Sequence, residues 1–312
     1  MRPNASAAEI NATAPRSAAA NAAITEKKYD RSMPSGDDPE VVINRWSNVA
    51  QNWDKHRDII WQMFAPVTDA LVDEVGIRHG SKVLDISTGQ GEPALSIARL
   101  LGSEGRVLGI DPVSKMIGVA RREAERLGLL NAQFEVCAAD EIPEPADSFD
   151  AAVCRFGVMF IPSPVEAVRE ILRVLRPGGR MAFAVWHLVE RNPFFYTLSS
   201  VVDRYVPSRT STADALDTFR FAKPGRLKEL IELTHAGDVR ERLLQFTIEV
   251  PMSAGEFWTF RFEMSEMLRE KVSELSAEQL DAMKGEAIQE FQKYSVGTGL
   301  SFPAEVLIVS AA

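Results

Sequence analysis

The stretch VLDISTGQGEPALSIARLLGSEGRVLGIDP, residues 83–112, decides the fold. It begins as an apolar strand, passes through Gly89 and Gly91 into a helix, and ends in a second apolar strand that closes on Asp111. A glycine turn between a strand and a helix, with an acid twenty residues after the second glycine, is typical of doubly wound α/β folds that bind a nucleotide. The stretch therefore predicts a nucleotide-like ligand at the glycines.

An acid upstream of the glycines, Asp85, distinguishes between the ligands that such a turn can hold. A carboxylate at the tip of the strand repels a pyrophosphate by about 1 kcal/mol in water-like surroundings, and by more when it is shielded. It therefore opposes a nicotinamide dinucleotide, which the pattern Gly89-x-Gly91-x-x-Ala94 would otherwise permit. The same carboxylate attracts the ammonium and sulfonium groups of S-adenosylmethionine, and Asp111 can take both ribose hydroxyls of that ligand.

The alternation of strands and helices continues beyond this stretch. Near-continuous apolar runs predict strands with both faces covered, as in a parallel sheet, and amphipathic segments lie between them. The expected strands are residues 82–87, 106–111, 133–139, 149–156 and 180–186. This order predicts a doubly wound sheet, whose ligands bind beyond the carboxyl ends of the strands.

The N-terminal part divides into a tail and a helical cap. Residues 1–38 are rich in Ala, Asn, Ser and Pro and lack an apolar stripe, which predicts a disordered tail; an organellar transit peptide is the alternative. Residues 39–78 predict a helical cap. It consists of an amphipathic helix over 40–56 and a second helix with Pro66 in its first turn.

The C-terminal part adds an insertion to the sheet core of residues 79–250. Residues 251–300 predict two helices, opened by capping boxes at Ser253 and Ser276, before a final strand in 301–312. We expect the aromatic and methionine stripe of this insertion, like that of the first cap helix, to lie over the cofactor as a lid. Plain core packing is the alternative for both stripes.

Composition restricts the class of protein and its partners. The chain has 312 residues, of which 46% are hydrophobic and 25% charged, and a net charge of −9. This composition is globular, and the negative charge disfavours a nucleic-acid partner. No apolar run approaches the roughly eighteen residues of a membrane span. Cys137 and Cys154 fit neither a disulfide framework nor a zinc site, so we expect no metal and a cytoplasmic setting. A homodimer is compatible with this composition.

Five motifs, in order along the chain, resemble one enzyme family. They are VLDISTGQGEPAL (83–95), GIDPVSKMI (109–117), AADEIP (138–143), FDAAVCRFGVMFIPSP (149–164) and LRPGGRMAFAVW (175–186). Over residues 46–195 the chain resembles the class I S-adenosylmethionine-dependent methyltransferases, above all the small-molecule enzymes related to the menaquinone and ubiquinone C-methyltransferases. The resemblance implies an α/β, Rossmann-like sheet of seven strands with the last strand antiparallel. One departure is Ser87-Thr88, which stands where relatives usually have Ala or Gly followed by Cys or Thr.

The resemblance also implies a set of cofactor-binding residues. Asp85 would lie near the methionine ammonium, Asp111 would hold the ribose, and Asp140 would accept a hydrogen bond from the adenine amino group. The full implied set is Trp53, Asp85, Ser87, Gly89, Gln90, Gly91, Asp111, Pro112, Met116, Asp140, Glu141, Arg155 and Phe156.

Catalysis and the methyl acceptor are less well defined. Methyl transfer is an in-line displacement that depends on alignment, so a base is needed only when the acceptor must lose a proton. His187 and His56 are candidate bases, and Arg155 could instead polarise the acceptor; structural roles remain the alternative for each. A flat or apolar small molecule would suit the expected substrate lining, which is Trp46, Met159, Phe160, Trp186, Phe194 and Phe257. The alternative function is S-adenosylmethionine binding without methyl transfer.

Overall fold

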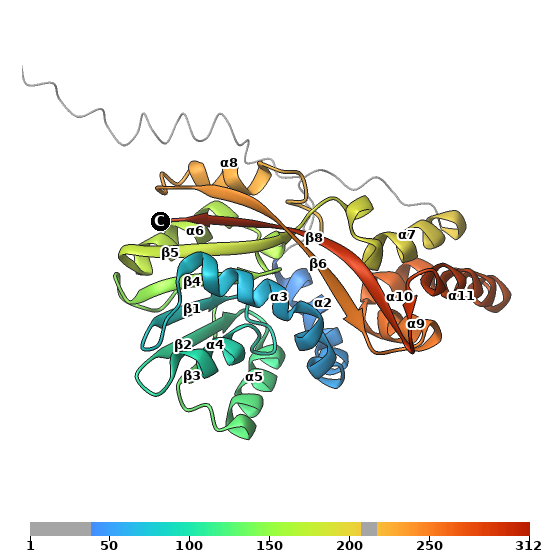
Figure 1. Ribbon diagram of the computed structural model, residues 1–312, viewed down its shortest axis with the longest axis horizontal. Helices are drawn as coiled ribbons and strands as arrows, with labels where there is room; N and C mark the ends of the chain where they lie inside the picture. The colour runs from blue at the N-terminus through green and yellow to red at the C-terminus, as the bar shows by residue number, and fades with distance from the viewer. Residues whose placement is uncertain (1–38, 207–216) are drawn as a thin grey trace, which may run out of the picture. The chain divides into compact units, whose positions relative to one another are not determined.

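A single mixed sheet organises the fold (Figure 1). The computed structural model describes residues 39–206 and 217–312, and the expected tail of residues 1–38 lies outside them. Within the described residues the main path of the sheet has seven strands, in the order β3 (Ala132–Val136), β2 (Arg106–Asp111), β1 (Lys82–Ile86), β4 (Phe149–Arg155), β5 (Leu175–Trp186), β8 (Gly299–Ala311) and β6 (Arg240–Val250). A two-residue strand, β7 (Ser295–Val296), pairs with the start of β8.

The direction of the strands confirms the expected topology. Strands β3, β2, β1, β4 and β5 run parallel, while β8 is antiparallel to both of its neighbours. The sequence order reverses between β1 and β4, because β2 pairs on one side of β1 and β4 on the other. Such a switch point opens a crevice at the carboxyl ends of the strands, where doubly wound folds bind their ligands. The Rossmann-like α/β fold with a last antiparallel strand is therefore confirmed.

Helices cover the sheet and explain the apolar strand sequences. Helix α3 (Arg57–Val75) packs across β4, β5, β6 and β8, α6 (Pro164–Val174) packs on β5, and α8 (Arg226–Glu232) packs on β8. Helices α4 (Ala94–Leu101) and α5 (Ser114–Leu127) pack on β2 and β3. Consequently Val83 and Leu84 on adjacent positions of β1 are both fully buried, although they face opposite sides of the sheet.

The expected start of the second cap helix at Pro66 is wrong. Helix α2 (Pro39–Lys55) ends before His56, and α3 then runs without a break through Pro66. A proline inside a helix leaves the carbonyl four residues earlier without its backbone donor. That carbonyl belongs to Gln62, and both Gln62 and Pro66 are exposed, so water can satisfy it. The proline is therefore tolerated inside the helix.

The insertion between β6 and β8, where every residue is described, has three helices instead of the expected two. Both expected capping boxes form, with Ser253 opening α9 (Ala254–Met264) and Ser276 opening α11 (Ala277–Gln292). The additional helix is α10 (Glu266–Val272), whose N-cap Ser265 accepts a hydrogen bond from the backbone of Leu268.

The aromatic stripe of the insertion is core and not a lid. Phe257 is fully buried, with its ring 5.1 Å from that of Phe302 on β8 and 4.8 Å from that of Phe291 on α11. It also contacts Phe194 on α7 (Pro193–Tyr205), at 5.4 Å between ring centroids. The alternative named for this stripe, plain core packing, therefore holds in the structure.

In residues 39–206 and 217–312 every helix falls short of the length and apolarity that a bilayer crossing needs. The same residues contain no group of three or more His, Cys, Asp and Glu placed to hold a metal ion.

Candidate active site

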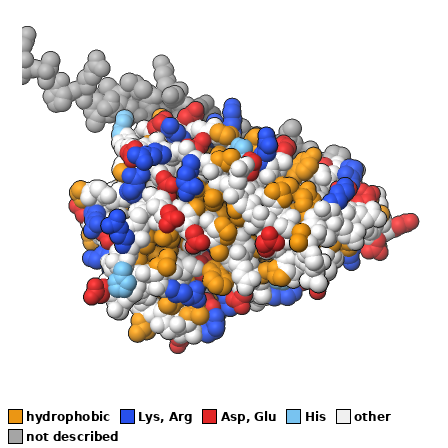
Figure 2. Space-filling model, in the orientation of Figure 1, with side chains coloured by type: hydrophobic (Ala, Val, Ile, Leu, Met, Phe, Trp, Pro, Cys, Tyr) orange, Lys and Arg blue, Asp and Glu red, His pale blue; other side chains and the backbone are white. Residues whose placement is uncertain are grey.

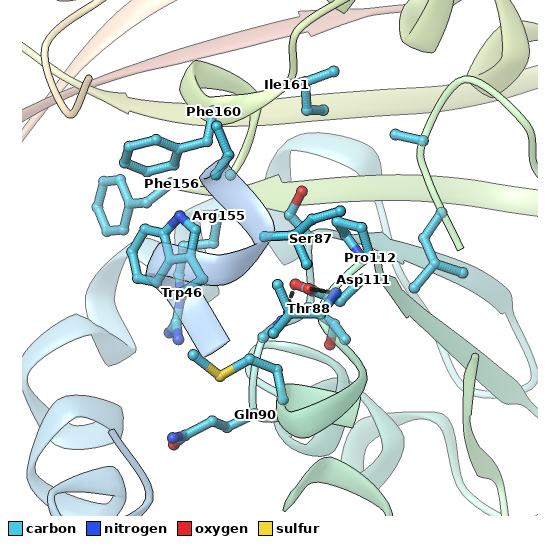
Figure 3. A pocket seen from close by; sticks show the side chains of 18 of the residues that line it. Trp46, Ser87, Thr88, Gln90, Asp111, Pro112, Arg155, Phe156, Phe160 and Ile161 are labelled. Carbon is cyan, nitrogen blue, oxygen red and sulfur yellow. Dashed lines mark hydrogen bonds between the residues drawn. The ribbon is translucent and has the colours of Figure 1, made fainter. Parts of the chain in front are cut away.

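A cavity of about 310 Å³ lies at the carboxyl ends of β1, β2 and β4, at the switch point of the sheet. Its walls come from α2, the first turns of α3, the glycine turn after β1, and the segments that follow β2, β3 and β4. Figure 3 shows Trp46, Phe156 and Phe160 on one side of it and Thr88, Asp111 and Pro112 on the other. The volume is at the lower end of the range for small-molecule sites.

The glycine turn shapes the floor of this cavity. Ser87, Gly89 and Gly91 all have positive φ values, of 55°, 56° and 101°. A Cβ on Gly91 would lie 2.9 Å from Leu95 Cδ1, so this glycine permits close packing of the turn on α4. A Cβ on Gly89 would meet nothing within 4 Å. Gly91 therefore serves the fold, while Gly89, which lines the cavity, leaves room for a ligand.

Asp85 lies beneath the turn with one carboxylate oxygen unsatisfied. The side chain is fully buried at the end of β1. Its Oδ2 accepts hydrogen bonds from the Thr88 hydroxyl at 2.6 Å and the Ala94 amide at 3.0 Å. Its Oδ1 is buried without a partner in the described part of the chain. Burial raises the pKa of Asp85 to about 7. A buried, unpartnered oxygen of this kind marks a place where a ligand donor fits, and an ammonium group meets that requirement.

Asp111 presents a carboxylate to the cavity from the end of β2. Its Oδ2 accepts from the Gly89 amide at 3.0 Å and its Oδ1 accepts from the Val113 amide at 2.9 Å. Burial raises the pKa of Asp111 to about 6. Each carboxylate oxygen can accept a further hydrogen bond, so the two oxygens suit a pair of neighbouring hydroxyls.

Most of the residues implied for the cofactor meet at this cavity. Of the expected set, the lining residues are Trp53, Ser87, Gly89, Gln90, Asp111, Pro112, Met116, Asp140, Arg155 and Phe156. Asp85, Gly91 and Glu141 do not line it. Gln90 has a second contact, because its side-chain amide donates to the Ala50 carbonyl of α2 at 3.1 Å. The glycine turn therefore holds the cap helix directly.

The aromatic side of the cavity contains only part of the expected substrate lining. Trp46 and Phe160 line it, with ring centroids 5.1 Å apart. The other four expected residues are buried and do not line it: Met159, Trp186, Phe194 and Phe257. Trp186 nevertheless supports the wall, because it stacks on Phe156 at 4.3 Å with an interplanar angle of 2°. Phe156 has a φ of 60°, a strained conformation that turns the chain after β4 toward the cavity.

Arg155 is the expected catalytic residue that the structure brings to the cavity. Its Nη1 donates to the Thr68 hydroxyl of α3 at 2.8 Å. Burial lowers the pKa of Arg155, while the nearby carboxylates of Glu92 and Asp85 act to raise it. The guanidinium is therefore held by α3, and the charges of two acids act on it without a direct ion pair.

The two candidate histidines lie elsewhere, and neither lines the cavity. His187 Nδ1 lies 2.7 Å from Glu305 Oε2 of β8. His56 Nε2 lies 2.7 Å from Glu263 Oε2 of α9, at the junction between α2 and α3. Both contacts join segments distant in sequence, which suits a structural role.

Sequence reasoning missed several residues of the lining. Val42 and Ile43 of α2 lie on the same helix face as Trp46, so helical spacing could have found them. Arg57, Trp61 and Glu92 also line the cavity. Arg57 and Trp61 reach the cavity because α3 begins at Arg57, which the misassigned Pro66 hid, whereas Glu92 reaches it from the turn before α4.

The comparisons with known proteins agree with this geometry. Residues 77–218 match the model of a family described as a methyltransferase domain. The ubiquinone/menaquinone biosynthesis C-methyltransferase UbiE of Cronobacter sakazakii is 28% identical over 174 residues, which are 53% of this chain and 65% of that protein. The UbiE protein of Cellvibrio japonicus is 31% identical over 170 residues, 51% of this chain and 66% of that protein. The chain thus spans just under two thirds of the length of these two relatives.

A solved structure shows the same fold. The YcgJ protein of Bacillus subtilis is 18% identical, with a TM-score of 0.50, and the match covers 78% of this chain and 96% of that one. The chain itself has a doubly wound sheet with a glycine turn beside two strand-end acids. The family match and the relatives, together with this arrangement, support the class I S-adenosylmethionine-dependent methyltransferase family for this chain.

Proposed function

We propose that this protein transfers a methyl group from S-adenosylmethionine to a small, flat and apolar molecule. The observation that carries the proposal is a pair of acids beside the glycine turn: Asp111 lines the cavity, and Asp85 is buried beneath the turn with one unpaired oxygen. Buried acids without a cationic partner are costly, and they suit a ligand that brings a positive charge and hydroxyl groups.

The residues of the cavity have distinct proposed roles toward the cofactor. When bound, S-adenosylmethionine supplies a methyl group on a positively charged sulfur. Asp85 would hold the ammonium group through its free oxygen, and Asp111 would hold the ribose hydroxyls. Asp140 would accept a hydrogen bond from the adenine amino group, with Met116 against the ring.

The acceptor would lie on the aromatic side of the cavity. Trp46, Phe156 and Phe160 offer flat apolar surfaces there, and they exclude water from the reacting atoms. Arg155 would orient or polarise an oxygen of the acceptor. Since the rate depends on alignment, rigid walls contribute to it directly.

A small-molecule acceptor suits the cavity better than a nucleic acid. The cavity lies beneath α2, and acidic and basic side chains are mixed across the face of the molecule that Figure 2 shows. The chain carries a net charge of −9, whereas phosphate backbones need clustered positive charge.

The test is methyl transfer with an isotopically labelled methyl donor. The purified protein is incubated with labelled S-adenosylmethionine and a small-molecule extract of cells, and labelled products are identified by mass spectrometry. We expect one or a few labelled aromatic or apolar products, absent with Asp111→Ala. Tight binding of the donor without any labelled product would instead favour the non-methylating alternative.

A further inference from the structure

Glu92 is an acid that lines the cavity and has no role in the proposed binding of the cofactor or of the acceptor. It follows the glycine turn directly, two residues before α4 begins. The Ser96 hydroxyl donates to Glu92 Oε2 at 2.8 Å, and the Trp61 indole N–H donates to Ser96 Oγ at 2.9 Å. Two helices therefore fix this carboxylate through a chain of hydrogen bonds, with Trp61 on α3 and Ser96 on α4.

The surroundings leave the Glu92 charge without a direct counter-ion. In the described part of the chain no lysine or arginine lies within salt-bridge distance of it, although the Arg155 charge acts on it from further away. Burial raises the pKa of Glu92. A partly buried acid against an apolar wall is costly unless a ligand donates to it. A capping role at the start of α4 is the competing structural explanation.

We propose that Glu92 accepts a hydrogen bond from an O–H or N–H group of the methyl acceptor and takes its proton during transfer. This inference rests on the proposed function and narrows its acceptor class to molecules with a protic group next to an aromatic or apolar skeleton. Ser96 is a positioning residue, because it acts through Glu92, and Trp61 holds Ser96 while also lining the cavity.

Atoms and charge are conserved in the proposed step. The acceptor atom forms a bond to the methyl carbon, and the bond from that carbon to sulfur breaks with its electron pair remaining on sulfur. The proton of the acceptor passes to the Glu92 carboxylate, which neutralises the charge that the acceptor gains. Solvent can take this proton after the product leaves.

Matched binding probes test the inference without knowledge of the natural acceptor. The protein is saturated with S-adenosylhomocysteine, and ligand-observed NMR then measures the affinities of phenol, aniline, anisole and toluene. We expect phenol or aniline to bind about tenfold more tightly than anisole and toluene, as a hydrogen bond to a charged acceptor implies. The phenol and aniline arms distinguish an O–H from an N–H acceptor. Equal affinities for all four probes would overturn the proposal.

Variants separate this role from helix capping. Glu92→Ala should remove the preference for the protic probe, and Ser96→Ala should reduce it, while the exposed control Glu104→Gln should keep it. Glu92→Gln keeps a hydrogen-bond acceptor without charge. Its preference should therefore vary less between pH 5 and pH 8 than that of the unaltered protein, in which protonation of the Glu92 carboxylate weakens the preference at the acidic end. Asp85 and Asp111 titrate in the same window and contribute equally to both proteins.

Two outcomes contradict the proposal. One is a preference that survives in Glu92→Ala; the other is identical pH dependence in the unaltered protein and Glu92→Gln. If the unaltered protein does not bind S-adenosylhomocysteine at all, the proposed function fails instead, so the two failures are distinguishable.

Discussion

Acidic side chains have different partners in two regions of this molecule. At the carboxyl ends of β1 and β2, Asp85 and Asp111 accept hydrogen bonds from backbone amides and a hydroxyl, and burial raises their pKa values to about 7 and about 6. In the region of β8 and the insertion, Glu263 and Glu305 pair with basic side chains. The hydrogen bond from Lys55 lowers the pKa of Glu263. Burial acts to raise the pKa of Glu305, but the contacts with His187 and Gln245 together lower it.

The difference indicates which region stabilises the fold and which binds a ligand. An acid with a lowered pKa stabilises the folded state at neutral pH, whereas an acid with a raised pKa destabilises it. The cavity region also contains the strained residues Ser87 and Phe156, while the other region contains the packed aromatic core around Phe257. We infer that the cavity acids persist because a cationic ligand compensates them.

The largest expected effect concerns stability in the aromatic core. Phe257→Ala should lower the free energy of unfolding by about 3–5 kcal/mol, because it leaves a void among Phe194, Phe291 and Phe302. Phe160→Ala, at the partly open cavity wall, should cost clearly less. Denaturant unfolding measures both. Equal losses would show that the two regions do not differ in packing.

The next effect concerns ligand affinity. Asp85→Asn should weaken S-adenosylhomocysteine binding by roughly 2–4 kcal/mol, because the charge that meets the ammonium group is removed in a shielded site. Glu305→Gln, which alters an acid of the other region, should leave the affinity within about twofold while lowering stability. Titration calorimetry gives the affinities. An unchanged affinity in Asp85→Asn would refute the role of this carboxylate.

The raised pKa values predict an unusual dependence of stability on pH. An acid whose pKa is higher in the folded state stabilises the fold when protonated, and this contribution disappears as the pH rises through the folded-state pKa. Between pH 5.5 and 7 the free protein should therefore lose about 2 kcal/mol through Asp85 alone, at about 1.4 kcal/mol per pH unit. The midpoint of denaturant unfolding should fall less steeply with rising pH in Asp85→Asn than in the unaltered protein. The same slope in both proteins would contradict the raised pKa.

The smallest effect concerns the motion of the cap. Hydrogen exchange in α2 should slow several-fold when S-adenosylhomocysteine binds, because α2 contributes Trp46 and Trp53 to the cavity and contacts the glycine turn through Gln90. Exchange in α9 and α11 should not change, because their stripe is core. Gln90→Ala should weaken the response of α2. If hydrogen exchange in α9 and α11 slowed as much as exchange in α2, the insertion would form a lid over the cofactor together with α2.

The sequence was sufficient for the local features of the fold and the acids of the site. Strands β1 and β2 were predictable because both of their faces are apolar, and Asp85 and Asp111 follow from their places at the strand ends. Long-range packing was not predictable. The periodicity of Phe257 shows a buried helix face but not whether that face meets a cavity or Phe302, which lies 45 residues later. The partners of His187 and His56 are likewise more than a hundred residues away.

Calorimetric titration with S-adenosylmethionine at pH 6.5, in buffers of different ionisation enthalpy, measures whether the cavity binds this cofactor through Asp85. We expect one site of micromolar-range affinity and release of a proton on binding, because a cation at Asp85 favours the ionised form of an acid whose pKa is about 7. Asp85→Asn should bind more weakly and release less. Absence of binding, or tighter binding of NADH than of S-adenosylmethionine, would contradict the assignment of this cavity.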